Sequence, residues 1–385
     1  MAVISKELFY EKISENMSCS VFHYWNEKCF WGIPTYFFYG NLAKGTLTFF
    51  FPIALMKMFL DYRRKKKNLL RRFVDFQARN ALYAIALGTS MFTSICLWHK
   101  IFGRFYYNTI LMLPAFISAP SLLVVRPENQ VLNTLMFFNS FVETLLIKSR
   151  ISPKQQVFGF MLISGILMYL FENRRKKLDF TYFWFFTPQL RVQQSESSKK
   201  CYHEEPCESY WYNGIVNYFL LGYGINVTKG FLSKFKLLTK HPGTLVDVAF
   251  NKSNSDTGLF LGAYVGIYRI VVCYLSKSLK INKKWLGLIA GTLAGFAYNI
   301  SPNLQFLILG ITTILQILYH IISTKLGITN HFYQRIMIYG IAHAYNFHNK
   351  FLNSDICSPY YSKMVDACAN NVTKEMYQRL LKRLF

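Results

Sequence analysis

The sequence predicts an all-helical membrane protein that crosses the bilayer several times and consists of two homologous halves. Three observations predict this fold. Hydrophobic residues make up 52% of the 385 residues, whereas charged residues make up only 16%. Uncharged runs such as 105–125 and 285–324 are long enough to span a bilayer, which takes about 20 helical residues. Similar residues also recur in the same order in both halves.

The recurring residues indicate an internal duplication. Cys29 matches Cys207, and Cys96 matches Cys273. The other matches are Cys19 and His23 with Cys201 and His203, Asn41-x-x-Lys44-Gly45 with Asn226-x-x-Lys229-Gly230, Val74-Asp75 with Val246-Asp247, Val142–Leu145 with Leu315–Leu318, and Gly165-Ile166 with Gly340-Ile341. A single match would carry no weight, but this many in one order favour two copies of one ancestral unit.

Each half contains five apolar segments that we expect to be helices. They cover 33–58, 80–99, 106–125, 131–148 and 156–172 in the first half, and 210–232, 257–276, 285–301, 304–322 and 333–348 in the second. The first segment of each half carries a Lys, Lys44 or Lys229, at a cost of about 2.5–3.5 kcal/mol at the bilayer centre. These two segments therefore either span or lie in the interface, which gives about 8–10 apolar helices.

The segments define five regions of the chain. These are a cysteine-containing N-terminal segment at 1–32, a first helical membrane module at 33–177, a polar linker with a second Cys/His segment at 178–208, a second helical membrane module at 209–348, and a polar tail at 349–385. The tail ends in a basic amphipathic helix at 373–385, with Met376, Leu380, Leu381 and Leu384 on one side. We expect this helix to rest on lipid headgroups.

The chain is strongly basic, with 44 Lys and Arg against 19 Asp and Glu, a net charge of +25. The basic runs lie beside apolar segments, at Arg63–Lys67, Arg71-Arg72 and Arg174–Lys177. Runs in this position set membrane topology and bind anionic headgroups. We therefore expect the lipid bilayer, and no nucleic acid, as the partner of these charges.

Two apolar segments carry glycine at every fourth position: Gly258, Gly262 and Gly266, then Gly287, Gly291 and Gly295. Glycine at this spacing forms a smooth groove along one helix face and lets two backbones approach closely in lipid. We expect these residues to face neighbouring helices. The first half lacks both triplets, so the two copies have diverged.

Two charges lie inside apolar segments, Arg269 in the second half and Glu143 in the first. Intramembrane charges face the bundle interior or water and are functional candidates. The alternative for Arg269 is that it snorkels towards the membrane surface, and Glu143 lies close to the boundary at Lys148.

The cysteine and histidine pairs allow three interpretations. Cys19, Cys29, Cys201 and Cys207 could form disulfides or paired thiols, or could be unpaired structural cysteines. With His23 and His203 they could also bind zinc, but their spacing matches no established zinc motif, so we expect no metal site. No nucleophile elbow, phosphate loop, dinucleotide fingerprint or zinc-protease motif occurs, so we expect no enzyme and no cofactor.

Several of these motifs resemble the transmembrane protein 135 family, also described as a peroxisomal membrane protein family. The resemblance rests on Cys19…His23-x-Trp25-x3-Cys29, Cys207-x-Ser209-Tyr210-x3-Gly214, the stretch from Gly258 to Cys273, and Ile289-Ala290-Gly291-x-Leu293-Ala294-Gly295. The glycine-triplet segments also resemble the mitochondrial inner-membrane translocase channels. The chain departs from the family at Gln316, where Glu is usual, and in a shorter linker.

The resemblance implies a non-enzymatic protein of mitochondrial and peroxisomal membranes. It implies a role in mitochondrial fission through the dynamin-related GTPase, in peroxisome organisation and in fatty-acid homeostasis. The alternative is a transporter or translocase-like conduit for lipid or another solute, which the duplication and Arg269 favour. A water-accessible cavity beside Arg269 would favour the conduit. Close packing around Arg269 without water would favour a scaffold.

Overall fold

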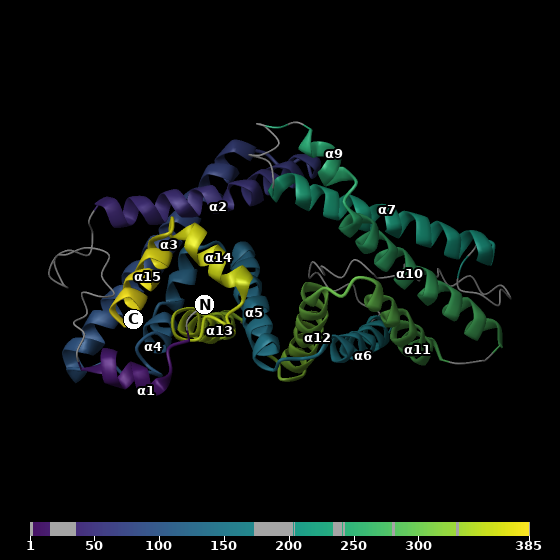
Figure 1. The fold of residues 1–385 in the computed structure, drawn as a ribbon. Coiled ribbons are helices and arrows are strands. Elements are labelled where there is room, and N and C mark those ends of the chain that lie inside the picture. Colours follow the sequence, from purple (N-terminus) through teal and green to yellow (C-terminus); the bar gives the residue numbers. More distant parts are fainter. Residues whose placement is uncertain are drawn as a thin grey trace. The chain divides into compact units, whose positions relative to one another are not determined.

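The structure, a computed structural model, describes residues 3–15, 36–172, 203, 205–233, 241, 243–278, 282–328 and 331–384 (Figure 1). Within these ranges it consists of helices and contains no strand, which confirms the all-helical prediction. Residues 16–32 of the N-terminal segment, the linker up to residue 202 and the basic run Arg174–Lys177 lie outside the described residues.

The protein is a multi-pass membrane protein. Six helical stretches of the described chain are long and apolar enough to cross a bilayer: Gly40–Arg63, Leu69–Phe102, Pro127–Lys148, Pro153–Phe171, Thr244–Ser278 and Leu304–Lys325. The first apolar segment of the chain is one of them, and its Lys44 is exposed.

Each of the ten predicted segments contains helix. Those of the first half are α2 (Tyr36–Arg63), α3 (Leu69–Phe102), α4 (Met112–Ile117) with the 3-10 helix η3 (Ala119–Val124), α5 (Pro127–Lys148) and α6 (Pro153–Glu172). Those of the second half are α7 (Cys207–Ser233), α10 (Lys252–Ser278), α11 (Lys283–Gly295) with the 3-10 helix η4 (Phe296–Ile300), α12 (Leu304–Lys325) and α13 (Phe332–Leu352). The short α1 (Lys6–Phe9) and α9 (Thr244–Ala249) and the tail helices α14 (Pro359–Cys368) and α15 (Val372–Leu384) complete the fold.

Contacts divide the chain differently from the two sequence halves. Unit 1 combines Met1–Arg150 with Ile328–Phe385, and unit 2 is the continuous stretch Ile151–Gly327. The fifth helix of each half has therefore been exchanged: α6 belongs to unit 2 and α13 to unit 1. Sequence similarity identifies which segments are copies, but it does not specify which unit each copy completes.

The two exchanged helices make equivalent contacts in the unit they join. In unit 2, α6 packs against α11 and α12; in unit 1, α13 packs against α4, η3 and α5. The matched glycines lie at these contacts. A Cβ on Gly165 would lie 3.0 Å from the carbonyl oxygen of Leu288 in α11, and one on Gly340 would lie 3.0 Å from the Cβ of Ala119 in η3. This repeated contact pattern supports the internal duplication.

Helices α13, α14 and α15 lie beside α3 and α5 in unit 1 (Figure 1). Tyr339, Phe347 and Phe351 of α13 are at most 1% exposed in its hydrophobic core. The apolar side of α15 also enters this core, since Met376 and Leu380 are buried. The expectation that this helix rests on headgroups is therefore corrected, because the periodicity of a helix predicts an apolar face without specifying what covers it.

The turn between α2 and α3 carries a cluster of basic residues. Asp61 is buried and pairs with Lys66 at 3.2 Å and with Arg72 at 3.1 Å. The remaining cations of the turn are exposed: Arg63, Arg64, Lys65, Lys67 and Arg71. They lie at the ends of two candidate membrane spans, where basic side chains meet lipid headgroups.

Candidate functional site

The first glycine triplet lies along the contact between α10 and α7. A Cβ on Gly258 would lie 2.9 Å from the carbonyl oxygen of Phe219, and one on Gly262 would lie 3.0 Å from that of Ile215. At Gly266 it would lie 2.6 Å from the Ile215 side chain. The triplet therefore allows the two helices to approach each other closely.

The second triplet serves the contact between α11 and α6. A Cβ on Gly291 would lie 2.8 Å from the carbonyl oxygen of Ser164, and one on Gly295 would lie 2.6 Å from the Cα of Met161. Ser164 also donates a hydrogen bond to the carbonyl oxygen of Gly291 at 2.8 Å. Gly287, the first residue of this triplet, is buried.

Replacing Gly291 with Leu should destabilise unit 2, because backbone atoms of α6 occupy the space that the new side chain needs. Overpacking of this kind costs about 1–3 kcal/mol or more. The matched control is Gly224→Leu in α7, where nothing lies within 4 Å of the added Cβ. Thermal melting of the purified protein in detergent checks this, and equal midpoints for the two variants would contradict the packing role.

Arg269 of α10 packs against the start of α7. Its Nη1 donates to the carbonyl oxygen of Tyr210, and its guanidinium carbon lies 4.2 Å from the centre of the Tyr210 ring. A Cβ on Gly214 would lie 2.8 Å from that same Nη1, so Arg269 fills the space over this glycine. The charge is held by a cation–π contact and a backbone oxygen within unit 2.

Glu143 of α5 is buried in unit 1 and holds the start of α14. Ser358, the N-cap of α14, donates through its hydroxyl to a carboxylate oxygen of Glu143 and accepts from the Tyr361 N–H at 3.1 Å. The Ser358 N–H donates to the Thr144 hydroxyl at 3.0 Å. A carboxylate is favourable at this end of a helix, and this accounts for a Glu at this buried position.

The cysteine candidates are only partly described. Cys19, Cys29 and Cys201 lie outside the described residues. Cys207 begins α7 and is half-buried.

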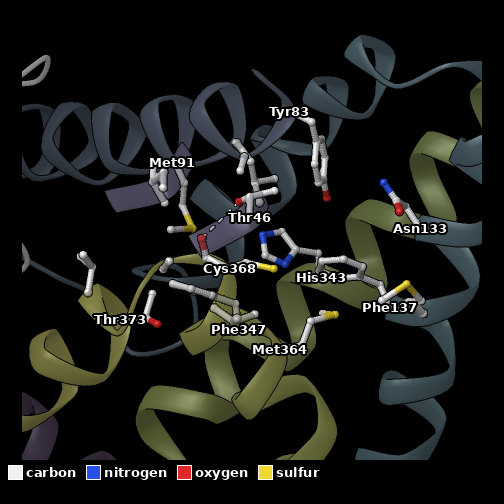
Figure 2. A pocket seen from close by; sticks show the side chains of 18 of the residues that line it. Thr46, Tyr83, Met91, Asn133, Phe137, His343, Phe347, Met364, Cys368 and Thr373 are labelled. Carbon is white, nitrogen blue, oxygen red and sulfur yellow. Dashed lines mark hydrogen bonds between the residues drawn. The ribbon is translucent and has the colours of Figure 1, made fainter. Parts of the chain in front are cut away.

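Unit 1 encloses an apolar cavity of about 80 Å³ between α2, α3, α5, α13 and the tail helices (Figure 2). Its walls include Phe50, Met91, Phe137, Phe347 and Met364. A cavity of about 150 Å³ with apolar walls can hold benzene, so this space suits a few carbon and oxygen atoms. All of its described lining residues belong to unit 1.

Two polar atoms beside this cavity lack a partner among the described residues. Both Nε2 of His343 and Nδ2 of Asn133 are buried and form no hydrogen bond. The other ring nitrogen of His343 is paired with the Tyr361 hydroxyl at 3.0 Å, and the imidazole lies in the middle of the labelled side chains in Figure 2. Since a buried polar atom without a partner costs about 1–3 kcal/mol, a bound molecule with a polar group beside these two atoms would offset this cost.

The remaining polar groups of the cavity are neutral or already paired. The Thr46 hydroxyl donates to the carbonyl oxygen of Cys368 at 3.2 Å, and the Thr373 hydroxyl to Asp366 at 2.6 Å. Burial raises the pKa of the Cys368 thiol to about 12, so this thiol is uncharged at neutral pH. No Asp, Glu, Lys or Arg is among the described lining residues, and the cavity therefore suits an uncharged molecule.

Sequence reasoning did not single out this cavity. His343 and Asn133 both lie in ordinary apolar segments, at 333–348 and 131–148. An Asn and a His inside apolar helices were the only available signal, because the helices that join them are far apart in the chain.

Comparison with known proteins adds no family to this geometry. No family model matches the chain, and no solved structure matches it.

Proposed function

We propose that this protein is a non-enzymatic membrane protein that handles neutral lipid, with the unit 1 cavity as its binding site. The observation that carries the proposal is the pair of unpartnered polar atoms, His343 Nε2 and Asn133 Nδ2, beside an otherwise apolar cavity. The amide N–H of Asn133 is a donor and needs an acceptor oxygen. The apolar walls suit the carbon atoms next to that oxygen.

The described residues that line the cavity carry no formal charge, which favours an uncharged ligand over a charged one. A carboxylate would be buried without a counter-charge among the described lining residues, at a cost of several kcal/mol. An acyl ester offers the same carbonyl oxygen without a charge. We therefore assign the ester-bearing end of a fatty-acyl lipid to the cavity.

The organelle belongs to the same proposal and rests on the resemblance to the transmembrane protein 135 family. That resemblance supports mitochondrial and peroxisomal membranes, mitochondrial fission through the dynamin-related GTPase, and fatty-acid homeostasis. The exposed cations of the α2–α3 turn support contact with anionic headgroups. The packing of Arg269 onto Tyr210 and Gly214 supports a scaffold in unit 2 more than a conduit.

Asn133→Leu should weaken ester binding without lowering stability. The substitution removes the donor, and loss of one hydrogen bond of about 1–1.5 kcal/mol corresponds to an affinity about 5–10-fold lower. It also removes a buried unpaired atom, so the melting temperature should stay equal or rise. The measurement is photo-crosslinking of the purified chain in nanodiscs with a diazirine-bearing fatty-acyl ester, followed by peptide mapping.

The matched control is Thr46→Val, since the Thr46 hydroxyl lines the same cavity but already donates to Cys368. We expect it to keep ester labelling of the peptides from α3, α13 and α14. An unlabelled ester should compete at neutral pH, whereas the free fatty acid should compete poorly. Labelling that is unchanged by Asn133→Leu and not reduced by unlabelled ester would refute the cavity as the lipid site.

A further inference from the structure

His203, Cys207 and Cys273 form a cluster in unit 2 that is independent of the lipid cavity. One ring nitrogen of His203 and the two sulfur atoms all lie within 4.8 Å of one another. His203 precedes α7, Cys207 begins that helix, and Cys273 comes from α10. The fold thus places Cys273 of α10 beside the pair His203 and Cys207. The spacing of these residues in the sequence gives no reason to expect this third neighbour.

The geometry points to a zinc site formed by His203 Nε2, Cys207 Sγ and Cys273 Sγ. Two thiolates and one imidazole are ligands that zinc prefers. Around a tetrahedral zinc ion, with bonds of about 2.0–2.3 Å, ligand atoms lie roughly 3.3–3.8 Å apart. The separation of Nε2 from Cys273 Sγ is 3.1 Å, so small side-chain shifts suffice to take up an ion.

The imidazole of His203 is already held as a ligand would be. Its Nδ1 lies 2.6 Å from the carbonyl oxygen of Glu205, which can only accept a hydrogen bond. Nδ1 therefore carries the proton, and Nε2 presents its lone pair to the two thiols. A hydrogen bond from the other ring nitrogen to a backbone carbonyl is the arrangement that fixes the tautomer of metal-binding histidines.

The ring of Tyr210 stacks on the imidazole of His203 and fixes its orientation. The rings of His203 and Tyr210 stack with centroids 4.3 Å apart and an interplanar angle of 9°. Tyr210 also holds Arg269, one helical turn before Cys273 on α10. These contacts hold the segment that carries His203 against α7 and α10, the helices that carry Cys207 and Cys273.

A zinc ion bound to this cluster would remain accessible to solvent and could be exchanged. Cys273 is buried, whereas His203 and Cys207 are half-buried, so water can approach from one side. Three protein ligands leave the fourth tetrahedral position for water or another ligand. A bound ion would connect the segment before α7 to α10, close to the contact that Gly258, Gly262 and Gly266 make with α7.

The test is metal analysis of the purified full-length chain, prepared with reductant and exchanged against buffer containing zinc. We expect the wild type to hold one zinc ion per chain more than the triple variant His203→Ala, Cys207→Ser, Cys273→Ser. The matched control, Cys368→Ser, removes a thiol of unit 1 and should keep the wild-type content. Replacing a group that only hydrogen-bonds a metal ligand lowers metal affinity roughly 10–100-fold. Replacing His203, Cys207 or Cys273 alone should lower the zinc affinity by more than that.

A second measurement needs no substitution and so does not depend on how the variants fold. Replacement of zinc by Co²⁺ in the wild type should give a thiolate-to-cobalt charge-transfer band and the visible spectrum of tetrahedral cobalt. Equal zinc content in the wild type and the triple variant, or a cobalt spectrum without the charge-transfer band, would overturn the site. So would a quantitative disulfide between Cys207 and Cys273 in protein purified without reductant.

Discussion

Removal of residues 328–385 is expected to unfold unit 1 and to leave unit 2 folded. The deleted stretch contains α13, whose Tyr339, Phe347 and Phe351 are buried in the unit 1 core. Truncating one large buried aromatic side chain costs about 3–5 kcal/mol. Losing all three aromatic side chains costs as much as the whole free energy of unfolding of a typical protein, about 5–15 kcal/mol.

Thiol alkylation distinguishes this outcome from the behaviour of two independent halves. Cys96 reports on unit 1 and Cys273 on unit 2, and both are buried in the full chain. We expect the truncated protein to react rapidly at Cys96 and slowly at Cys273, as mapped by mass spectrometry. Rapid reaction at Cys273 with Cys96 still protected would show that each half folds alone, and would contradict the exchange of the fifth helices.

The second large effect is expected from Gly45→Ala. A Cβ on Gly45 of α2 would lie 2.5 Å from three backbone atoms at the end of α14: the carbonyl oxygens of Ala367 and Cys368 and the nitrogen of Asn370. Backbone atoms of a helix end cannot move aside as a flexible side chain can. We expect the methyl group to push α2 away from α14 and to destabilise unit 1 by about 1–3 kcal/mol.

Gly40→Ala provides the matched control in the same helix. Nothing lies within 4 Å of a Cβ on Gly40, so this variant gains the helix propensity of alanine, about 0.5–1 kcal/mol, without a clash. Thermal melting in detergent should place Gly45→Ala below the wild type and Gly40→Ala at or above it. If Gly45→Ala melts with or above Gly40→Ala, α2 and α14 do not pack as described.

Much of the fold could be predicted from the sequence because the apolar segments are long. Each of the ten segments contains helix, and the segment containing Pro114 and Pro120 is divided into a short α-helix and a 3-10 helix. The motif Asn41-x-x-Lys44-Gly45 was noticed as a repeat, but its role as the contact with α14 was not. That contact depends on residues from the other end of the chain, which hydropathy cannot pair.

The candidate sites were less predictable for the same reason. Arg269 and Glu143 are conspicuous because they are charges in apolar helices, but nothing in the sequence pairs them with Tyr210 and Ser358. Cys273 stands out in the sequence as the repeat of Cys96 and as the end of the Gly258–Cys273 stretch, but not as a neighbour of His203 and Cys207. Side chains that meet through tertiary packing need the fold before their chemistry can be interpreted.

The lipid-handling proposal is tested most directly in cells from which the gene has been deleted, by imaging mitochondrial shape and neutral-lipid droplets after re-expression. We expect the wild type and Thr46→Val to restore both, and Asn133→Leu to insert at the same level without restoring either. Full restoration by Asn133→Leu, or deleted cells with unchanged mitochondria, peroxisomes and lipid droplets, would contradict the account.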